Sequence, residues 1–277
     1  MGSDFLLGMG AVDQHRIVIA NTRAMLQIHR FVHSIMNSLN KQGVIVTGGS
    51  GGYGEGIAEA FAAAGASVWI TGRDQLKLNR TASRIGASPF VADVTDGAAW
   101  DRLFAEVLQK AGRVDILVNN AGEGVQIGPV SAQTDETLER SIASNLTGAM
   151  LGCARASAVM QKQASGLIIN IGSACSVHAW PGWAAYSAAK AGLLMFTRCL
   201  LSELRPHGVR VTSLLPSWGQ TDFTSAAGLP PRTPEVLSAC ISPANLGQLV
   251  LQLAQLPAHL LAEEVRLWPM VQPIGQL

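Results

Sequence analysis

Two residues of this 277-residue chain have the types and the spacing for proton transfer. Tyr186 and Lys190 are four positions apart in the sequence, which would place them on one face of a helix, one turn from each other. An ammonium group close to a phenol favours the phenolate and lowers the phenol pKa from its usual value of about 10. We therefore expect Lys190 to acidify Tyr186, so that the phenol exchanges a proton near neutral pH. Because many surface helices carry the same spacing, the pair needs support from the rest of the chain.

A glycine-rich stretch upstream is typical of a nucleotide-phosphate site. The β-branched run Gly43–Thr47 predicts a buried parallel strand, the glycine-rich stretch 48–54 follows it, and helical periodicity comes next. In such a unit the glycines let the backbone turn and the ligand approach, and the helix N-terminus faces the pyrophosphate. The glycines fit two spacings, T-G-x-x-x-G-x-G through Gly52 and Gly54 and T-G-x-x-G-x-x-G through Gly51 and Gly54.

The end of the second predicted strand bears on the choice of cofactor. Ser67–Thr71 is this strand, and Gly72, Arg73 and Asp74 follow it. A site that prefers NAD usually has a carboxylate at this strand end, where it binds the ribose 2′-hydroxyl. Here that place falls on Gly72, and the Arg73 guanidinium that follows can pair with a 2′-phosphate. We favour NADP(H) over NAD(H); the alternative is that Arg73 is a solvated loop charge and Asp74 binds the ribose.

The remaining pattern predicts a doubly wound α/β domain with a parallel sheet. Ligands bind at the carboxyl ends of the strands in such sheets, which places Asp93 beside the cofactor cleft unless it only caps a helix. The expected architecture is one Rossmann-like domain over 43–277, with a seven-stranded sheet and helices on both faces. Further strands are expected over 89–92, 115–118, 166–171, 208–214 and 263–268, and helices over 98–111, 134–163 and 242–256.

Composition excludes several other classes. Only 14% of residues are charged and 48% are hydrophobic, which suits a largely buried parallel sheet. A net charge of +1 without a basic run argues against a nucleic-acid partner, and the apolar runs are too short to span a bilayer. The four cysteines and six histidines lack metal-ligand spacing. We expect no metal site and reduced thiols, in keeping with a cytoplasmic location.

Residues 1–42 differ from the rest of the chain. No Asp or Glu occurs between Gln14 and Lys41, and apolar residues recur at helical spacing over about 22–39, which predicts an amphipathic helix. We interpret it as an extra helix that packs on the domain or on a second subunit. The alternatives are a transit peptide, which would direct import into an organelle, and a membrane-surface helix.

From residue 43 to residue 270 the chain resembles a short-chain dehydrogenase/reductase. This resemblance favours the first glycine spacing over the second, which is typical of sugar-nucleotide epimerases. The family's motifs occur in order: Thr47-Gly48 with Gly52 and Gly54, Asp93-Val94, Asn119-Asn120-Ala121-Gly122, Asn145, Ser173, Tyr186 with Lys190, and Pro216 with Thr221. Together with Arg73, the resemblance implies a cofactor site made of Gly48, Ser50, Gly52, Tyr53, Gly54, Arg73, Asp93, Val94, Asn120, Ala121, Gly122, Tyr186, Lys190, Pro216 and Thr221.

The resemblance also implies a catalytic tetrad and a reaction. Asn145 would hold a water in a proton relay to Lys190, and Ser173 would bind the substrate oxygen. Tyr186 would donate a proton to a carbonyl while hydride leaves the cofactor, and Lys190 would also bind the nicotinamide ribose. The sequence departs from the family at Ser217, where glycine usually follows the proline.

The substrate side is expected to be aromatic. Residues 222–241 form the family's variable lid, and Trp180, Trp183, Trp218 and Phe223 lie in or near it. Aromatic side chains there favour an apolar or ring-bearing substrate, although they suit packing of the lid or a subunit contact equally well. His178 follows Ser173 closely and is either a substrate contact or a polar loop residue.

These inferences lead to an oxidoreductase that transfers hydride between NADP(H) and a small carbonyl or alcohol substrate. The family often forms dimers and tetramers, so a homodimer or homotetramer is expected. Two alternatives remain open: a catalytically silent dinucleotide-binding regulator and an enzyme of the epimerase type.

Overall fold

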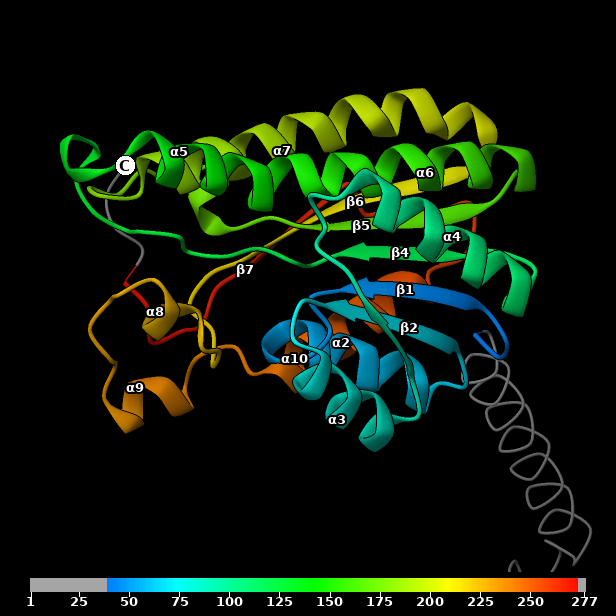
Figure 1. Cartoon of the computed structure of the whole chain (residues 1–277), viewed down its shortest axis with the longest axis horizontal. Coiled ribbons are helices and arrows are strands. Elements are labelled where there is room, and N and C mark those ends of the chain that lie inside the picture. Colours follow the sequence, from blue (N-terminus) through cyan, green and yellow to red (C-terminus); the bar gives the residue numbers. More distant parts are fainter. Residues whose placement is uncertain (1–38, 274–277) are drawn as a thin grey trace, which may run out of the picture. The chain divides into compact units, whose positions relative to one another are not determined.

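The computed structural model of the chain describes residues 39–273. The helix expected over about 22–39 lies outside them except for its last residue, Leu39, which is in a turn. The described part is one parallel sheet between two layers of helices (Figure 1). The sheet has seven strands in the order β3-β2-β1-β4-β5-β6-β7, and every neighbouring pair is parallel. This confirms the doubly wound fold. The strands are β1 (Gly43–Thr47), β2 (Ser67–Gly72), β3 (Ser88–Val91), β4 (Ile116–Asn119), β5 (Gly166–Ile171), β6 (Val209–Pro216) and β7 (Glu264–Leu267).

The strand sequences follow from burial on both faces of the sheet. Side chains alternate between the faces along a strand, so Val44 and Val46 of β1 join one apolar core while Ile45 joins the other. All three are fully buried. A strand covered on both faces has no polar side, which is why β1 reads as an unbroken apolar run.

Two helical layers supply the opposite walls of these cores. The layer below the sheet in Figure 1 contains α2, α3 and α10, and the layer above it contains α4, α5, α6 and α7. Phe61 of α2 and Val250 of α10 are fully buried in one core, and Phe104 of α4 and Met160 of α6 are buried in the other. The helices are α2 (Gly52–Ala63), α3 (Gln75–Ile85), α4 (Gly97–Ala111), α5 (Asp135–Ile142), α6 (Gly148–Gln163), α7 (Ala184–Leu204), α8 (Phe223–Ala226), α9 (Pro234–Ser238) and α10 (Pro243–Ala254).

The long helix expected over 134–163 is interrupted. α5 and α6 are joined by the five-residue π-helical turn Ala143–Thr147, which contains Asn145. A π turn widens the backbone by one residue and is frequent at functional sites. The expectation of a regular helix is therefore wrong at this turn.

The region expected to form the lid has little regular structure. It contains only the short helices α8 and α9. The helix that follows begins as expected, because the Ser242 side chain accepts the N–H of Asn245 and Pro243 occupies the first helical position. No helix in residues 39–273 is both long and apolar enough to cross a membrane.

Candidate active site

A large cavity of about 840 Å³ lies at the carboxyl ends of the strands, where doubly wound sheets bind ligands. It brings together nearly all of the residues proposed from the sequence. The predicted cofactor and catalytic residues that line it are Gly48, Ser50, Gly52, Tyr53, Arg73, Asp93, Val94, Asn120, Ala121, Gly122, Asn145, Ser173, Tyr186, Lys190, Pro216 and Thr221, and the predicted substrate residues are Trp180, Trp183 and Trp218. Gly54 and His178 are not part of this lining.

The backbone of the glycine turn distinguishes the two possible spacings. Gly48 and Gly52 have φ angles of 64° and 54°, a left-handed conformation that favours glycine. Gly51 has a φ of 179°, which any residue adopts. A Cβ at Gly54 would collide with the carbonyl group of Gly48. The conformation therefore requires glycine at the positions of T-G-x-x-x-G-x-G and not at Gly51.

The start of α2 fits a phosphate group. Its N-cap is Gly51, and none of the described side chains caps the helix. The first N–H groups of the helix are thus left for water or a ligand, and Gly51, Gly52 and Tyr53 line the cavity at this point. A pyrophosphate is the kind of anion that such a terminus binds.

The turn after β4 is fastened to β1. The Thr47 hydroxyl accepts the backbone N–H groups of Asn120 and Ala121 at 3.0 and 2.9 Å, and the Asn120 amide donates to the Thr47 carbonyl at 2.9 Å. Asn119 donates to Asn170 on β5 at 2.8 Å in the buried interior. These bonds join the Asn-Asn-Ala-Gly turn to β1 and β5 and hold it as the cavity wall.

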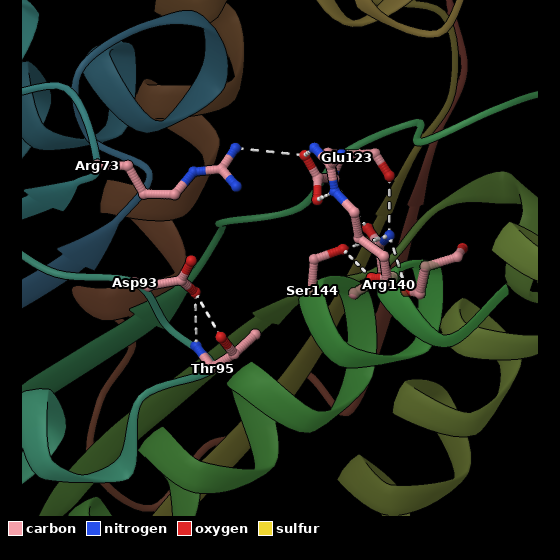
Figure 2. A network of polar contacts seen from close by, with 8 residues as sticks. Arg73, Asp93, Thr95, Glu123, Arg140 and Ser144 are labelled. Atoms are coloured by element: carbon pink, nitrogen blue, oxygen red, sulfur yellow. Dashed lines mark hydrogen bonds and ion pairs between the residues drawn. The ribbon is translucent and has the colours of Figure 1, made fainter. Parts of the chain in front are cut away.

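Arg73 is held across the cavity by a carboxylate (Figure 2). Its guanidinium lies 3.3 Å from Glu123, which also binds Arg140 at 2.7 and 2.9 Å. Hydrogen bonding from Arg140, more than the charge of Arg73, holds the pKa of Glu123 below its usual range. Neither Glu123 nor Arg140 was predicted from the sequence. The signal for Glu123 was its place directly after Asn-Asn-Ala-Gly.

The two carboxylates near Arg73 have local structural partners. Asp74 caps α3 by accepting the N–H of Lys77 at 3.0 Å. Asp93 accepts both the backbone N–H and the hydroxyl of Thr95 (Figure 2). The cap of α4 is Asp96, so the alternative interpretation of Asp93 as a helix cap is wrong.

Asn145 is almost fully buried and is tied to the residue after the Asn-Asn-Ala-Gly turn. Its side-chain oxygen accepts the Glu123 N–H at 3.2 Å, and its amide donates to the Glu123 carbonyl at 2.8 Å. A Cβ built on Gly122 would meet both the Asn145 oxygen and the Lys190 ammonium. The π turn thus directs a helix residue into the cavity, next to Lys190.

Tyr186 and Lys190 are both buried, with 8% and 4% of their surface exposed. The Lys190 Nζ atom lies 5.8 Å from the centre of the Tyr186 ring and donates to the Ile171 carbonyl at 3.0 Å. Their common face of α7 and their meeting at the cavity agree with the expected arrangement.

The expected acidification of Tyr186 is wrong in this structure. Burial raises the pKa of Tyr186, and the Ser173 hydroxyl opposes that rise only in part. Burial also lowers the pKa of Lys190 to about 8. The i, i+4 pattern shows that the two groups are neighbours, but not that both are withdrawn from water, and desolvation disfavours both charged forms.

Aromatic side chains cover the Tyr186 end of the cavity. The Trp183 and Phe223 rings are stacked with centres 6.3 Å apart, and Phe223 meets the Tyr186 ring edge-on at 5.3 Å. His178 instead packs against Trp180 and Trp268, at 5.7 and 5.1 Å. The structure thus favours a packing role for His178 over a substrate contact. No group of three or more metal-ligating side chains occurs within the described residues.

Comparison with known proteins extends these observations. The family model described as short chain dehydrogenase matches residues 42–229. A 3-oxoacyl-[acyl-carrier-protein] reductase from Synechocystis sp. is 36% identical over 195 residues, which are 68% of this chain and 78% of that protein.

Two solved structures share the fold. A closed form of serine dehydrogenase complexed with NADP+ has a TM-score of 0.79 and 28% identity, over 85% of this chain and 98% of that one. A 3-ketoacyl-(acyl-carrier-protein) reductase from Brucella melitensis complexed with NADH has a TM-score of 0.76 and 27% identity, over 82% and 97%. With the glycine turn, the Asn-Asn-Ala-Gly wall and the Tyr186–Lys190 pair in one cavity, the chain belongs to the short-chain dehydrogenase/reductase family and is an NAD(P)-dependent oxidoreductase acting on CH–OH and C=O groups.

Proposed function

We propose that this protein reduces a ketone or aldehyde with NADPH, and that Tyr186 is the proton donor. The observation that carries the proposal is the burial of Tyr186 against Lys190 at the wall of the cavity that the glycine turn also lines. Because burial raises its pKa, the phenol stays protonated at neutral pH, which is the form a carbonyl reduction needs.

When bound, the cofactor would supply hydride to the carbonyl carbon. Side chains of the protein supply the proton and stabilise the negative charge that develops on the carbonyl oxygen. Tyr186 donates its proton to the carbonyl oxygen as negative charge develops there. The Ser173 hydroxyl, positioned by the Cys175 N–H at 3.1 Å, donates a second hydrogen bond to that oxygen. Lys190 provides positive charge beside the phenol, and Asn145 holds the water through which the proton is replaced.

The preference for NADPH rests on the end of β2. Gly72 has no carboxylate that would repel a 2′-phosphate. The Ser50 hydroxyl lies next to Gly72, 3.1 Å from the position that a Cβ on Gly72 would take. Arg73 reaches into the same cavity. Consumption of NADPH and of NADH should be followed with a panel of ketones and aldehydes. Equal use of both cofactors would contradict the preference, and the absence of any turnover would favour a silent dinucleotide-binding regulator. Tightly retained cofactor without net consumption would favour epimerase-type chemistry.

The rate of reduction should fall on the alkaline side of neutrality. With a pKa of about 8, Lys190 is protonated below that pH and neutral above it, so the positive charge beside Tyr186 disappears as the pH rises. We expect kcat/KM for carbonyl reduction to decrease through an apparent pKa near 8, measured from pH 6 to pH 10. A rate that stays constant to pH 9.5 would contradict this role for Lys190.

Replacing Glu123 by glutamine should strengthen NADPH binding. The change removes the carboxylate that competes with a 2′-phosphate for Arg73 and leaves the backbone bonds to Asn145 in place. Since the pair is partly exposed, we expect the NADPH Kd to fall by no more than about fivefold, while the NADH Kd is unchanged. The control variant Arg140→Gln removes the other partner of Glu123 and keeps its carboxylate. Glu123 then still pairs with Arg73, so the NADPH affinity should not improve. An equal effect on both cofactors would argue against this competition.

A homodimer or homotetramer is also part of the proposal. Ile142 at the end of α5 and Met150 on α6 are 37% and 39% exposed, which supports a subunit contact along these helices. Light scattering of the full chain tests the assembly. The cytoplasmic location stays an expectation.

A further inference from the structure

Four cationic side chains line the cavity, and three of them have partners that account for their charge or position. Arg73 pairs with Glu123, and Lys77 lies 3.8 Å from Asp222. Lys190, which lies beside Tyr186, donates to the Ile171 carbonyl. The fourth is Arg232, which has no carboxylate within 4 Å among residues 39–273. A guanidinium directed at a cavity without a counter-ion is a ready partner for an anionic ligand.

The Arg232 guanidinium is already held in place. It lies 4.5 Å from the centre of the Trp218 ring, and its Nη1 atom donates to the Thr224 hydroxyl at 2.9 Å. The aromatic face stabilises the cation without using its N–H groups. A guanidinium has five N–H donors in a planar fork, so most of them remain for a ligand. Less conformational freedom is lost on binding when the side chain is already ordered.

Arg232 belongs to the side of the cavity that faces the proposed chemistry. Thr224, its hydrogen-bond partner, follows Phe223, whose ring touches Tyr186. Its field also reaches the first turn of α2: burial raises the pKa of Tyr53, and the charge of Arg232 partly opposes that rise. Arg73, by contrast, lies at the end of β2.

We propose that Arg232 binds an oxyanion of a ligand in this cavity. Two sources offer that chemistry: a carboxylate on the carbonyl substrate, and the pyrophosphate of the cofactor. The inference rests on the proposed function, in which the cofactor and the carbonyl substrate bind in this same cavity. It adds an anion-binding residue outside the glycine turn and Arg73.

The test compares Arg232→Leu and Arg232→Lys with the wild-type full chain by calorimetric titration. NADP+ is titrated first. Phenylglyoxylate, a ring-bearing 2-oxo acid, and its neutral methyl ester are then titrated into the NADP+ complex, in which no reduction occurs. Loss of a charge-assisted hydrogen bond should weaken binding of the relevant oxyanion by about 10- to 100-fold in Arg232→Leu, and Arg232→Lys should recover part of it.

The pattern of losses identifies the source. Weaker binding of the acid alone assigns Arg232 to a substrate carboxylate, and weaker binding of NADP+ assigns it to the pyrophosphate. Unchanged NADP+ affinity together with equal affinity for acid and ester overturns the proposal. Equal losses in both variants with a lower Tm would show that Arg232 only packs on Trp218, and would overturn it as well. A wild-type chain that fails to bind NADP+ would instead contradict the proposed function.

Discussion

Replacing Tyr186 by phenylalanine should lower kcat for carbonyl reduction by about 10²- to 10⁴-fold, the usual contribution of a positioned general acid. The change removes the proton donor and keeps the ring that packs against Trp183 and Phe223. The Kd for NADPH should change little, since the glycine turn and Arg73 are untouched. Single-turnover oxidation of NADPH and fluorescence titration measure the two quantities separately.

Ser187→Ala is the matched control for that variant. Ser187 lies next to Tyr186 on α7, and its replacement also removes a buried hydroxyl. We expect this control to keep the wild-type rate. Normal reduction by Tyr186→Phe would refute the proposed proton donor, and equal losses in both variants would attribute the effect to the packing of α7.

Replacing Gly54 by alanine should nearly abolish cofactor binding. The new Cβ would meet the carbonyl group of Gly48 and the amide of Asn120, neither of which can move without distorting the turn. Overpacking of this kind costs about 1–3 kcal/mol or more, and here it displaces the N–H groups that face the cavity. We expect NADPH to bind at least about 100-fold more weakly because the start of α2 is no longer preorganised.

Gly51→Ala provides the comparison within the same turn. Its φ angle is ordinary, and its Cβ would approach only the flexible end of the Lys77 side chain. The Tm should stay close to that of the wild type, and the loss of affinity should be much smaller. Comparable losses in the two variants would mean that any added atom in the turn blocks the ligand, and that the spacing of the glycines is not what matters.

Most of the fold and most of the candidate site could be predicted from the sequence, because both depend on local sequence patterns. The apolar run of β1, the glycines after it and the Asn119–Gly122 turn are adjacent in the chain, and a parallel sheet then brings its strand ends together. Strand boundaries differed by one or two residues, as for β6, which extends to Pro216.

The remaining features depend on contacts between distant segments. Glu123 meets Arg73 and Arg140 across 50 and 17 positions of sequence, and no periodicity relates them. The pKa directions of Tyr186 and Lys190 follow from how much of the protein surrounds them, which spacing alone does not report. Arg232 meets Trp218 through a loop whose path no regular pattern predicts.

The π turn at Ala143–Thr147 limits where this chain can lose a residue during evolution. The five residues of this turn take up about the rotation of four α-helical residues, so deleting one of them would restore a regular helix and leave α5 and α6 in nearly the same orientation. Only the residues inside the turn would change direction, and Asn145 would lose its place next to Lys190 although no other residue had been exchanged. Deletions here should therefore be selected against as strongly as the loss of a reacting side chain.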